Sequence, residues 1–227
     1  MLVIFVTLYM NDLPNQFFYT KKEDKLNVIS HGVGFILSIV GLYFLISKGL
    51  QNYQFTYFIS LLIYGISLSL MYIASTLYHN SKTSSTRYKL RMFDMISIYI
   101  LIAGSYTPIT LTLLQNNGGW LLFSLIWLLA LLGIVWKVFT TGKYNFISTL
   151  LYIFMGGLWL FFIEEFVDTI PAPALWWITA GCFTYLVGVI FYLMDKTIKY
   201  NHFIWHLFVL LGSTCHYISI YFYVFPS

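Results

Sequence analysis

Two histidines near the end of the chain have the spacing of metal ligands. His202 and His206 lie four residues apart at the start of the last long apolar segment. In a helix, side chains at this spacing lie one above the other on one face, so a rigid element can offer two imidazoles to one metal ion. The alternative is that both histidines simply lie among lipid headgroups at a helix start. The pair alone favours neither interpretation.

Three more polar side chains occur at the edges of other apolar segments. Ser75 and His79 are again four residues apart, and Asp94 lies about one helical turn inside the following segment. A carboxylate within a membrane segment is costly unless it is paired, hydrated or close to a metal, so Asp94 is a candidate functional residue. The structural alternative is that Asp94 pairs with Arg91 at the membrane interface.

The composition indicates an all-α, polytopic membrane protein. Of the 227 residues, 59% are hydrophobic and only 9% are charged, which is too little polar surface to cover a soluble domain. About 20 helical residues cross a bilayer core. We predict a single seven-transmembrane-helix domain at residues 21–227, preceded by an N-terminal tail at residues 1–20. The sequence leaves two alternatives open for this tail: it lies against the membrane surface, or the start codon is placed too early. The expected spans are 28–48, 54–79, 92–114, 119–137, 146–163, 173–194 and 202–224.

The basic residues predict the orientation of these spans. Cytoplasmic loops are enriched in Lys and Arg. Of the 12 basic residues, all but Lys48 fall on the side of the membrane that holds the N-terminus. We therefore predict a cytoplasmic N-terminus and a C-terminus outside. The net charge of +4 is modest and lies in connecting segments, so it indicates membrane orientation. We expect no nucleic-acid binding. Cys182 and Cys215 lie within apolar spans, which favours free thiols over a disulfide framework.

The predicted orientation brings the polar side chains to one depth. Ser75 and His79 end the second span, Asp94 begins the third, and His202 and His206 begin the seventh, all at the cytoplasmic face. This agreement favours a metal site over incidental polar residues. Three histidines with a fourth position left to water are typical of catalytic zinc, which lowers the pKa of that water toward ~7.

Other residues have roles beyond the ligands of this site. Asp94 and Ser75 are expected to hold the bound water or to orient an imidazole. His216 lies ten residues beyond His206, about 15 Å along a helix, and is expected to be a hydrogen-bonded packing residue outside the site.

Several features of the spans carry structural expectations. Glu23, Asn27 and His31 share one helical face, and a solvated first turn is favoured there over direct metal binding. Pro108 is expected to free a carbonyl and bend the third span. The pair Gly156-Gly157 is expected to let a neighbouring helix approach closely.

The ordered motifs resemble those of a known family. Together they are similar to the bacterial hemolysin III proteins, within the progestin and adipoQ receptor (PAQR) superfamily, which also looks related to alkaline ceramidases. The resemblance extends from about residue 20 to the end of the chain. It is carried by Glu23-x3-Asn27-x3-His31, Ser75-x3-His79 with Asp94, Ala103-Gly-Ser-Tyr-Thr-Pro108, and His202-x3-His206-x9-His216.

The resemblance implies seven transmembrane helices with a cytoplasmic N-terminus, in the bacterial cell membrane. It also implies Zn²⁺ held by His79, His202 and His206, with Ser75 and Asp94 beside the metal. The resemblance implies more than one activity. The name of the family refers to cytolysis, whereas its bacterial members resemble regulators of membrane lipid composition. Receptor relatives are linked to ceramide hydrolysis.

Two functional hypotheses follow. In the first, the protein acts on or senses a membrane lipid with an acyl chain: zinc polarises an amide or ester carbonyl, its hydroxide attacks, and Asp94 transfers the proton. In the second, zinc is a structural clamp in a pore-forming protein or a regulator of lipid enzymes. A transporter is disfavoured because the spans lack further buried charges that could form a relay.

Overall fold

The regular elements of the protein are helical throughout the part of the chain that the structure describes. The computed structural model describes residues 19–51, 54–141, 143–195 and 197–224, and these contain no strand. The expected tail at residues 1–20 lies outside the described residues except for Tyr19 and Thr20.

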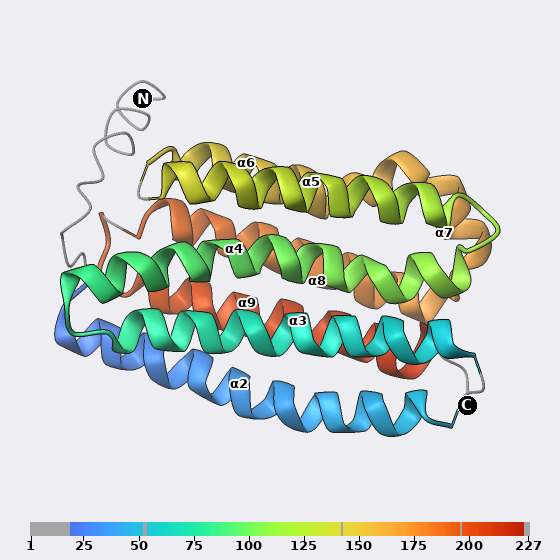
Figure 1. The fold of residues 1–227 in the computed structure, drawn as a ribbon, viewed down its shortest axis with the longest axis horizontal. Helices are drawn as coiled ribbons and strands as arrows, with labels where there is room; N and C mark the ends of the chain where they lie inside the picture. Colours follow the sequence, from blue (N-terminus) through green and yellow to red (C-terminus); the bar gives the residue numbers. More distant parts are fainter. Residues whose placement is uncertain (1–18, 52–53, 142, 196, 225–227) are drawn as a thin grey trace.

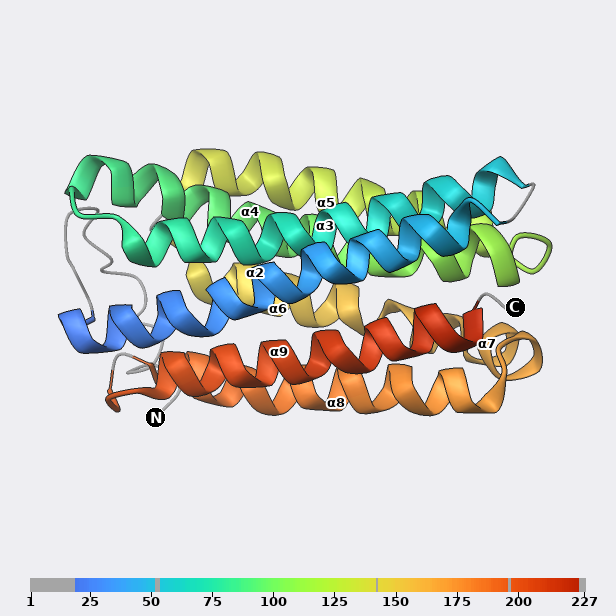
Figure 2. The ribbon, with the colours of Figure 1, turned by 90° about the horizontal axis from the view of Figure 1, so that it is seen from below.

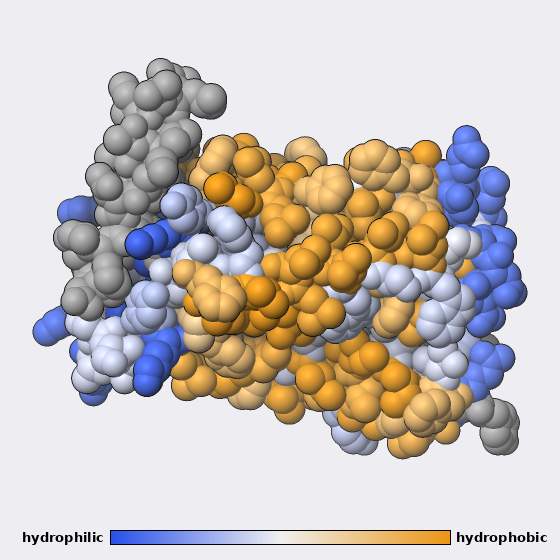
Figure 3. Space-filling model, turned by 45° about the horizontal axis from the view of Figure 1, so that its top comes forward, coloured by the Kyte–Doolittle hydropathy of each residue, from blue (hydrophilic) through white to orange (hydrophobic). Residues whose placement is uncertain are grey.

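Seven helical segments are long and apolar enough to cross a membrane, which confirms the predicted fold class. Orange apolar side chains form a broad band across the middle of the face shown in Figure 3, and hydrophilic residues lie at the two ends of this face. The elements are α2 (Lys21–Gly49), α3 (Phe55–Asn80), α4 (Ser84–Pro108) with η1 (Ile109–Leu113), α5 (Gly119–Thr140), α6 (Asn145–Gly156) with η2 (Leu158–Phe162) and α7 (Ile163–Thr169), α8 (Ala172–Leu193), and α9 (Asn201–Ser219) with η3 (Ile220–Val224).

The helices form one elongated bundle in which consecutive spans run in opposite directions (Figure 1). α2 packs along α3 and also contacts α9, while α8 packs along α9 (Figure 2). The apolar windows of α3 and α4 are the most buried, whereas α2, α5 and α8 direct most of theirs outward. Because no water covers the outside of the bundle in a bilayer, the exposed apolar residues are the expected lipid-facing surface.

The third span changes its helical geometry at Pro108. Residues Ile109–Leu113 form a π-helical turn directly after this proline. Proline has no backbone N–H to donate, so the pattern of helical backbone hydrogen bonds must change here. The hydroxyl of Thr107 donates to the Ala103 carbonyl at 2.9 Å, and the hydroxyl of Thr110 donates to the Tyr106 carbonyl at 3.0 Å. The expected bend and the freed carbonyl stay predictions, and the change that the structure shows is this widened turn directly after Pro108.

The fifth span is not one continuous helix, and the prediction for Gly156-Gly157 was wrong at Gly156. A Cβ atom added at Gly156 would meet nothing within 4 Å, so no neighbouring helix approaches closely there. Instead, α6 ends at Gly156 and the chain continues as the 3₁₀ turn η2 and then α7. Glycine weakens a helix interior, and two in succession permit this break.

The starts of α2 and α9 are tied together at one end of the bundle. Thr20 and Glu23 form a capping box at the start of α2. The second carboxylate oxygen of Glu23 accepts the backbone N–H of Tyr200 at 2.9 Å. Tyr200 precedes α9 in a left-handed conformation, with φ 66°, which a tyrosine adopts only when its surroundings hold it. Glu23 thus sets where α9 begins.

Close contact between α3 and α4 requires Gly104. A Cβ atom added there would lie 2.7 Å from Ser67 Cβ. Gly104→Ala should therefore lower the thermal midpoint in detergent, with a loss of about 1–3 kcal/mol from overpacking. The matched control is Gly156→Ala, which has open space around the new methyl group. Equal midpoints for the two variants would contradict this packing.

Candidate metal centre

Three histidines from two helices meet at the end of the bundle where α2 and α9 begin. His79 lies at the end of α3, and His202 and His206 lie on the first two turns of α9. Their exposed fractions are only 2%, 8% and 1%. One ring nitrogen from each lies within 4.8 Å of the others, which is close enough for all three to bind one metal ion. The structure therefore brings together the three histidines that the sequence singled out.

Each histidine is oriented by a hydrogen bond at its Nδ1 atom. His79 Nδ1 lies 3.0 Å from Asp24 Oδ1, and His202 Nδ1 lies 3.1 Å from Asp195 Oδ2. Both carboxylates can only accept, so both Nδ1 atoms carry the proton. We assign this tautomer from the hydrogen-bond network. The Nε2 atoms of both neutral rings are then lone-pair acceptors.

His206 follows the same pattern with a different partner. Its Nδ1 atom lies 3.0 Å from the hydroxyl oxygen of Ser30. That hydroxyl donates its own proton to the Asn27 carbonyl at 3.0 Å, so its oxygen is free to accept from the imidazole. All three Nε2 atoms therefore direct lone pairs into the cluster.

This donor set fits a metal cation. The Nε2 atoms of His79 and His202 are 3.2 Å apart, and two lone pairs facing each other at this distance repel unless a cation lies between them. Zinc–imidazole bonds of about 2.0–2.1 Å at a tetrahedral centre would separate two nitrogens by roughly 3.4 Å. Hydrogen-bonded Nδ1 atoms are also typical of metal-bound histidines.

Asp24 is itself held by a buried cation. Arg87 Nη2 lies 2.8 Å from Asp24 Oδ1, and the Arg87 side chain is only 6% exposed. The same guanidinium lies over the ring of Tyr78, 4.9 Å from its centroid. A charged carboxylate is expensive to bury alone, so this pairing lets Asp24 remain ionised next to His79.

Tyr19 completes the surroundings of His202. Its hydroxyl donates to Asp195 Oδ2 at 2.7 Å, and its oxygen lies 2.9 Å from His202 Nδ1. Burial and the neighbouring Asp195 carboxylate raise the pKa of Tyr19 well above its usual range. Tyr19 consequently stays a neutral phenol and a hydrogen-bond donor at physiological pH.

Asp94 and Ser75 lie beside the histidines, but they do not bind the Nδ1 atoms. The Asp94 carboxylate lies close enough to Ser75, His202 and Arg91 to interact with all three. Ser75 is buried at 2% exposure. Both line the same cavity as His202 and His206. Imidazole orientation therefore belongs to Asp24, Asp195 and Ser30, while Asp94 and Ser75 occupy the cavity wall.

The expectation of a solvated first turn on α2 was wrong. Glu23, Asn27 and His31 are only 8%, 0% and 3% exposed. The polar face of α2 packs against α3 and α9, not against water. His31 stacks on His206, with ring centroids 3.6 Å apart and planes inclined by 13°. The buried polar residues of α2 therefore pack against the histidine cluster. Among the described residues, they add no further member to that cluster.

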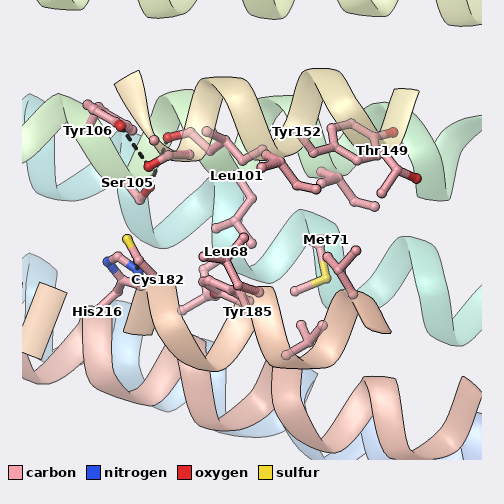
Figure 4. Close-up of a pocket in the computed structure, with 18 of the residues that line it drawn as sticks. Leu68, Met71, Leu101, Ser105, Tyr106, Thr149, Tyr152, Cys182, Tyr185 and His216 are labelled. Carbon is pink, nitrogen blue, oxygen red and sulfur yellow. Dashed lines mark hydrogen bonds between the residues drawn. The ribbon is translucent and has the colours of Figure 1, made fainter. Parts of the chain in front are cut away.

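The cavity extends from the histidines toward the other end of the bundle. Its volume is about 510 Å³, and α3, α4, α6, α8 and α9 contribute to its walls. His216 lies at the distant end, 4.0 Å from the Cys182 sulfur and stacked on Tyr185. It is a packing residue outside the histidine cluster, as its spacing predicts. Figure 4 shows this end of the cavity.

Sequence reasoning missed five residues of the site. Asp24 and Ser30 share a helical face with Asn27 and His31, and this shared face was the available signal. Asp195 and Tyr19 lie in connecting segments, and Arg87 was counted only as a topological charge. The sequence spacing of Asp195, Tyr19 and Arg87 does not predict their contacts. Only the folded structure shows these contacts.

Together, the fold and the site define a multi-pass membrane protein with three buried histidines placed to bind a metal ion. The chain belongs to the haemolysin-III related family, whose model matches residues 19–217. This confirms the expected family and, with seven apolar helices, a multi-pass bacterial membrane protein.

Individual relatives extend from bacteria to mammals. The chain is 38% identical to Hemolysin-3 of Bacillus cereus over 206 residues, covering 91% of this chain and 94% of the relative. It is 38% identical to the Hemolysin-3 homolog of Bacillus subtilis (strain 168), covering 90% and 96%. It is 30% identical to the human monocyte to macrophage differentiation factor, covering 73% and 70%. The mammalian likeness supports membership of the PAQR superfamily.

The histidine cluster predicts the metal content of the purified protein. We expect about one metal ion per wild-type chain, and a sharp loss in His206→Ala, because two imidazoles cannot close the site. His216→Ala removes a histidine that lies outside the cluster and should keep the metal. Elemental analysis of the three proteins is the measurement. Equal metal content in wild type and His206→Ala would contradict the site.

The hydrogen bond from His79 to Asp24 predicts a smaller effect. Asp24→Asn should weaken metal affinity by about 10–100-fold, because the imidazole loses the acceptor that orients it and raises its basicity. Competition with a chelator measures this affinity. Asp168→Asn makes the same change on an exposed acid of α7 and should leave affinity unchanged. Parallel weakening of both variants would mean that Asp24 has no specific role.

Proposed function

We infer that this protein is a zinc-dependent hydrolase-like protein of the membrane, acting on a lipid amide or ester near the inner leaflet in lipid homeostasis. One observation carries this proposal. Three convergent imidazole nitrogens lie at one end of an apolar cavity within the bundle. A metal centre that opens onto an apolar cavity is suited to a substrate with a polar reacting group and a long apolar chain.

Zinc is the metal that the donors favour. The site offers three neutral imidazoles, and the cavity approaches it on the side of Ser75 and Asp94. Imidazole nitrogen suits zinc, and a site with three protein ligands keeps a position open. When bound, zinc would supply Lewis-acid chemistry and activate water near neutral pH.

The residues of the chain can handle the proton in hydrolysis. Water adds its oxygen to the acyl carbon, the bond to the amine or alcohol breaks, and one proton passes from the water to the leaving group. Asp94 lines the cavity next to His202 and can accept and return this proton. Ser75 lines the cavity beside Asp94, where its hydroxyl can donate a hydrogen bond to the carboxylate.

The size and the apolar lining of the cavity suit an acyl chain. Its volume of about 510 Å³ lies within the usual range for ligand sites. Among its described lining residues, Asp94 is the one with a charged side chain. Apolar side chains such as Leu68, Met71 and Leu101 line the region between the two ends (Figure 4). An acyl chain would meet dispersion contacts there without desolvating charge.

A non-enzymatic role is the second candidate. His79 joins α3 to His202 and His206 of α9, and their Nδ1 partners come from α2 and the connector before α9. A metal ion here would clamp these segments together whether or not it acts on a lipid. In that case the protein would regulate lipid composition or form pores, in keeping with the names of its Hemolysin-3 relatives.

Replacement of Asp94 separates the two candidates. If the protein is an enzyme, Asp94→Asn should keep its metal but lose about 10²–10⁴-fold in turnover of acyl-amide and acyl-ester lipid analogues. Metal content, thermal stability and product release are measured on the same preparations. Asp168→Asn is the matched control and should retain wild-type turnover. Absence of turnover in wild type would leave the structural clamp as the function.

The cytoplasmic orientation of the site is a separate prediction. The excess of Lys and Arg favours a cytoplasmic N-terminus and a cytoplasmic connector between α5 and α6. Fluorescent-protein and phosphatase reporters, fused after Lys143 or at the C-terminus, measure this. The first fusion should fluoresce and the second should show phosphatase activity. The reverse pattern would move the histidines to the outer face.

A further inference from the structure

The cavity wall that α6 provides lacks a side chain at one position. Four residues of α6 line the cavity: Thr149, Tyr152, Ile153 and Gly156. Their spacing of three, four and seven residues from the first places them on one face of the helix. Thr149 and Tyr152 are labelled on this wall in Figure 4. A Cβ atom added at Gly156 would meet nothing within 4 Å. A side chain at this position would therefore project into the cavity, and glycine leaves that space free.

Hydrogen bonds of Tyr106 hold the end of α6 in place at this position. The Tyr106 hydroxyl lies 3.0 Å from the carbonyl oxygens of both Met155 and Gly156. It also accepts the backbone N–H of Trp159 at 3.2 Å. Such partners satisfy groups that the end of a helix leaves unpaired. Among the described glycines, only Gly118 has a left-handed backbone. A larger residue would therefore fit the backbone of Gly156 without strain.

Gly156 lies partway between the metal centre and the distant end of the cavity. The Tyr152 hydroxyl donates to the carbonyl of Met95, the residue after Asp94, at 2.7 Å. Gly156 follows Tyr152 by about one helical turn. With the reach of the Tyr152 side chain back toward the start of α6, Gly156 lies roughly 10 Å beyond the level of Asp94. The cavity continues past this level to His216. An acyl chain that fills the cavity from the metal centre therefore passes Gly156.

We propose that Gly156 determines the length of acyl chain that the cavity accepts, and that the preferred ligand is a long-chain acyl lipid. An extended hydrocarbon advances about 1.25 Å per carbon, because C–C bonds of about 1.5 Å meet at about 111°. Roughly the eighth carbon from the metal centre thus reaches Gly156. Carbons beyond it need the space that the missing side chain leaves. This inference rests on the proposed function, since it assumes that the acyl carbonyl lies at the metal centre.

Two hydroxamic acids test the proposal without hydrolysis. The hydroxamate group chelates metal ions through oxygen. Octanohydroxamic acid and octadecanohydroxamic acid therefore both begin at the metal centre, and they differ only in chain length. Calorimetry measures their affinities for the purified, metal-loaded protein in detergent. Each affinity is compared between variant and wild type, so that partition of the probe into detergent cancels. The wild-type protein should bind both acids.

Gly156→Phe fills the free space beside the acyl chain. Affinity for octadecanohydroxamic acid should fall by about 10–100-fold, because the ring overpacks against the carbons beyond the eighth. Affinity for octanohydroxamic acid should stay at the wild-type value. Gly156→Leu, with a smaller side chain, should lose less affinity for the long acid. Ala180→Phe adds the same ring on the exposed surface of α8, outside the described cavity lining, and should keep both affinities.

Metal content and thermal midpoint show whether each variant is folded, and Gly156→Leu carries the comparison if Gly156→Phe loses its metal. Three outcomes would overturn the inference. Wild-type affinity for the long acid in the folded variants would mean that the acyl chain does not pass Gly156, while leaving the acyl cavity intact. Equal loss of both acids would mean that position 156 does not select chain length. Failure of both acids to bind the wild-type protein would overturn the acyl cavity, and with it the proposed function.

Discussion

The hydrogen bonds at the histidine Nδ1 atoms are the constraint on which the rest of the site depends. Asp24, Asp195 and Ser30 each accept a proton from one imidazole. They thereby fix the tautomer and direct three lone pairs toward one point. Such a point is electrostatically unfavourable inside a bundle unless a cation occupies it. The same hydrogen bonds therefore explain both the ring orientations and the suitability of the site for a metal.

The rest of this end of the bundle serves to keep the two carboxylates in place. Arg87 neutralises Asp24, and Tyr19 donates to Asp195. Glu23 holds the backbone of Tyr200 in its left-handed conformation, so that α9 begins where its first two turns can present His202 and His206. Buried charge is tolerated at this depth because each group has a partner of opposite charge or a hydrogen-bond donor. The metal centre is thus a product of α2 and the residue pair before it, α3, α4, α9 and the connector before α9.

Much of the fold and part of the site follow from the sequence for simple physical reasons. A bilayer requires long apolar helices, so hydropathy locates all seven spans. Helical geometry fixes the relation of His202 to His206, and the ends of the spans fix their depth relative to His79. The break of the fifth span at Gly156-Gly157 could not be assigned, because glycine pairs occur both at close helix contacts and at helix ends.

The orienting residues could not be predicted, because their partners are decided by tertiary packing. Asp24 precedes Asn27 by three residues, yet only the packing of α2 against α3 and α9 decides that this face is buried. Tyr19 and Asp195 lie in segments without a helical period, so spacing says nothing of where their side chains point. His31 was expected in a solvated turn, and burial of the α2 stripe reverses that expectation.

The most direct test of the account is X-ray absorption at the zinc edge on protein purified without added metal. The account predicts a bound zinc ion with three imidazole nitrogens at about 2.0–2.1 Å and a light-atom fourth ligand. Sulfur in the coordination sphere, or fewer than three imidazoles around the metal, would contradict it.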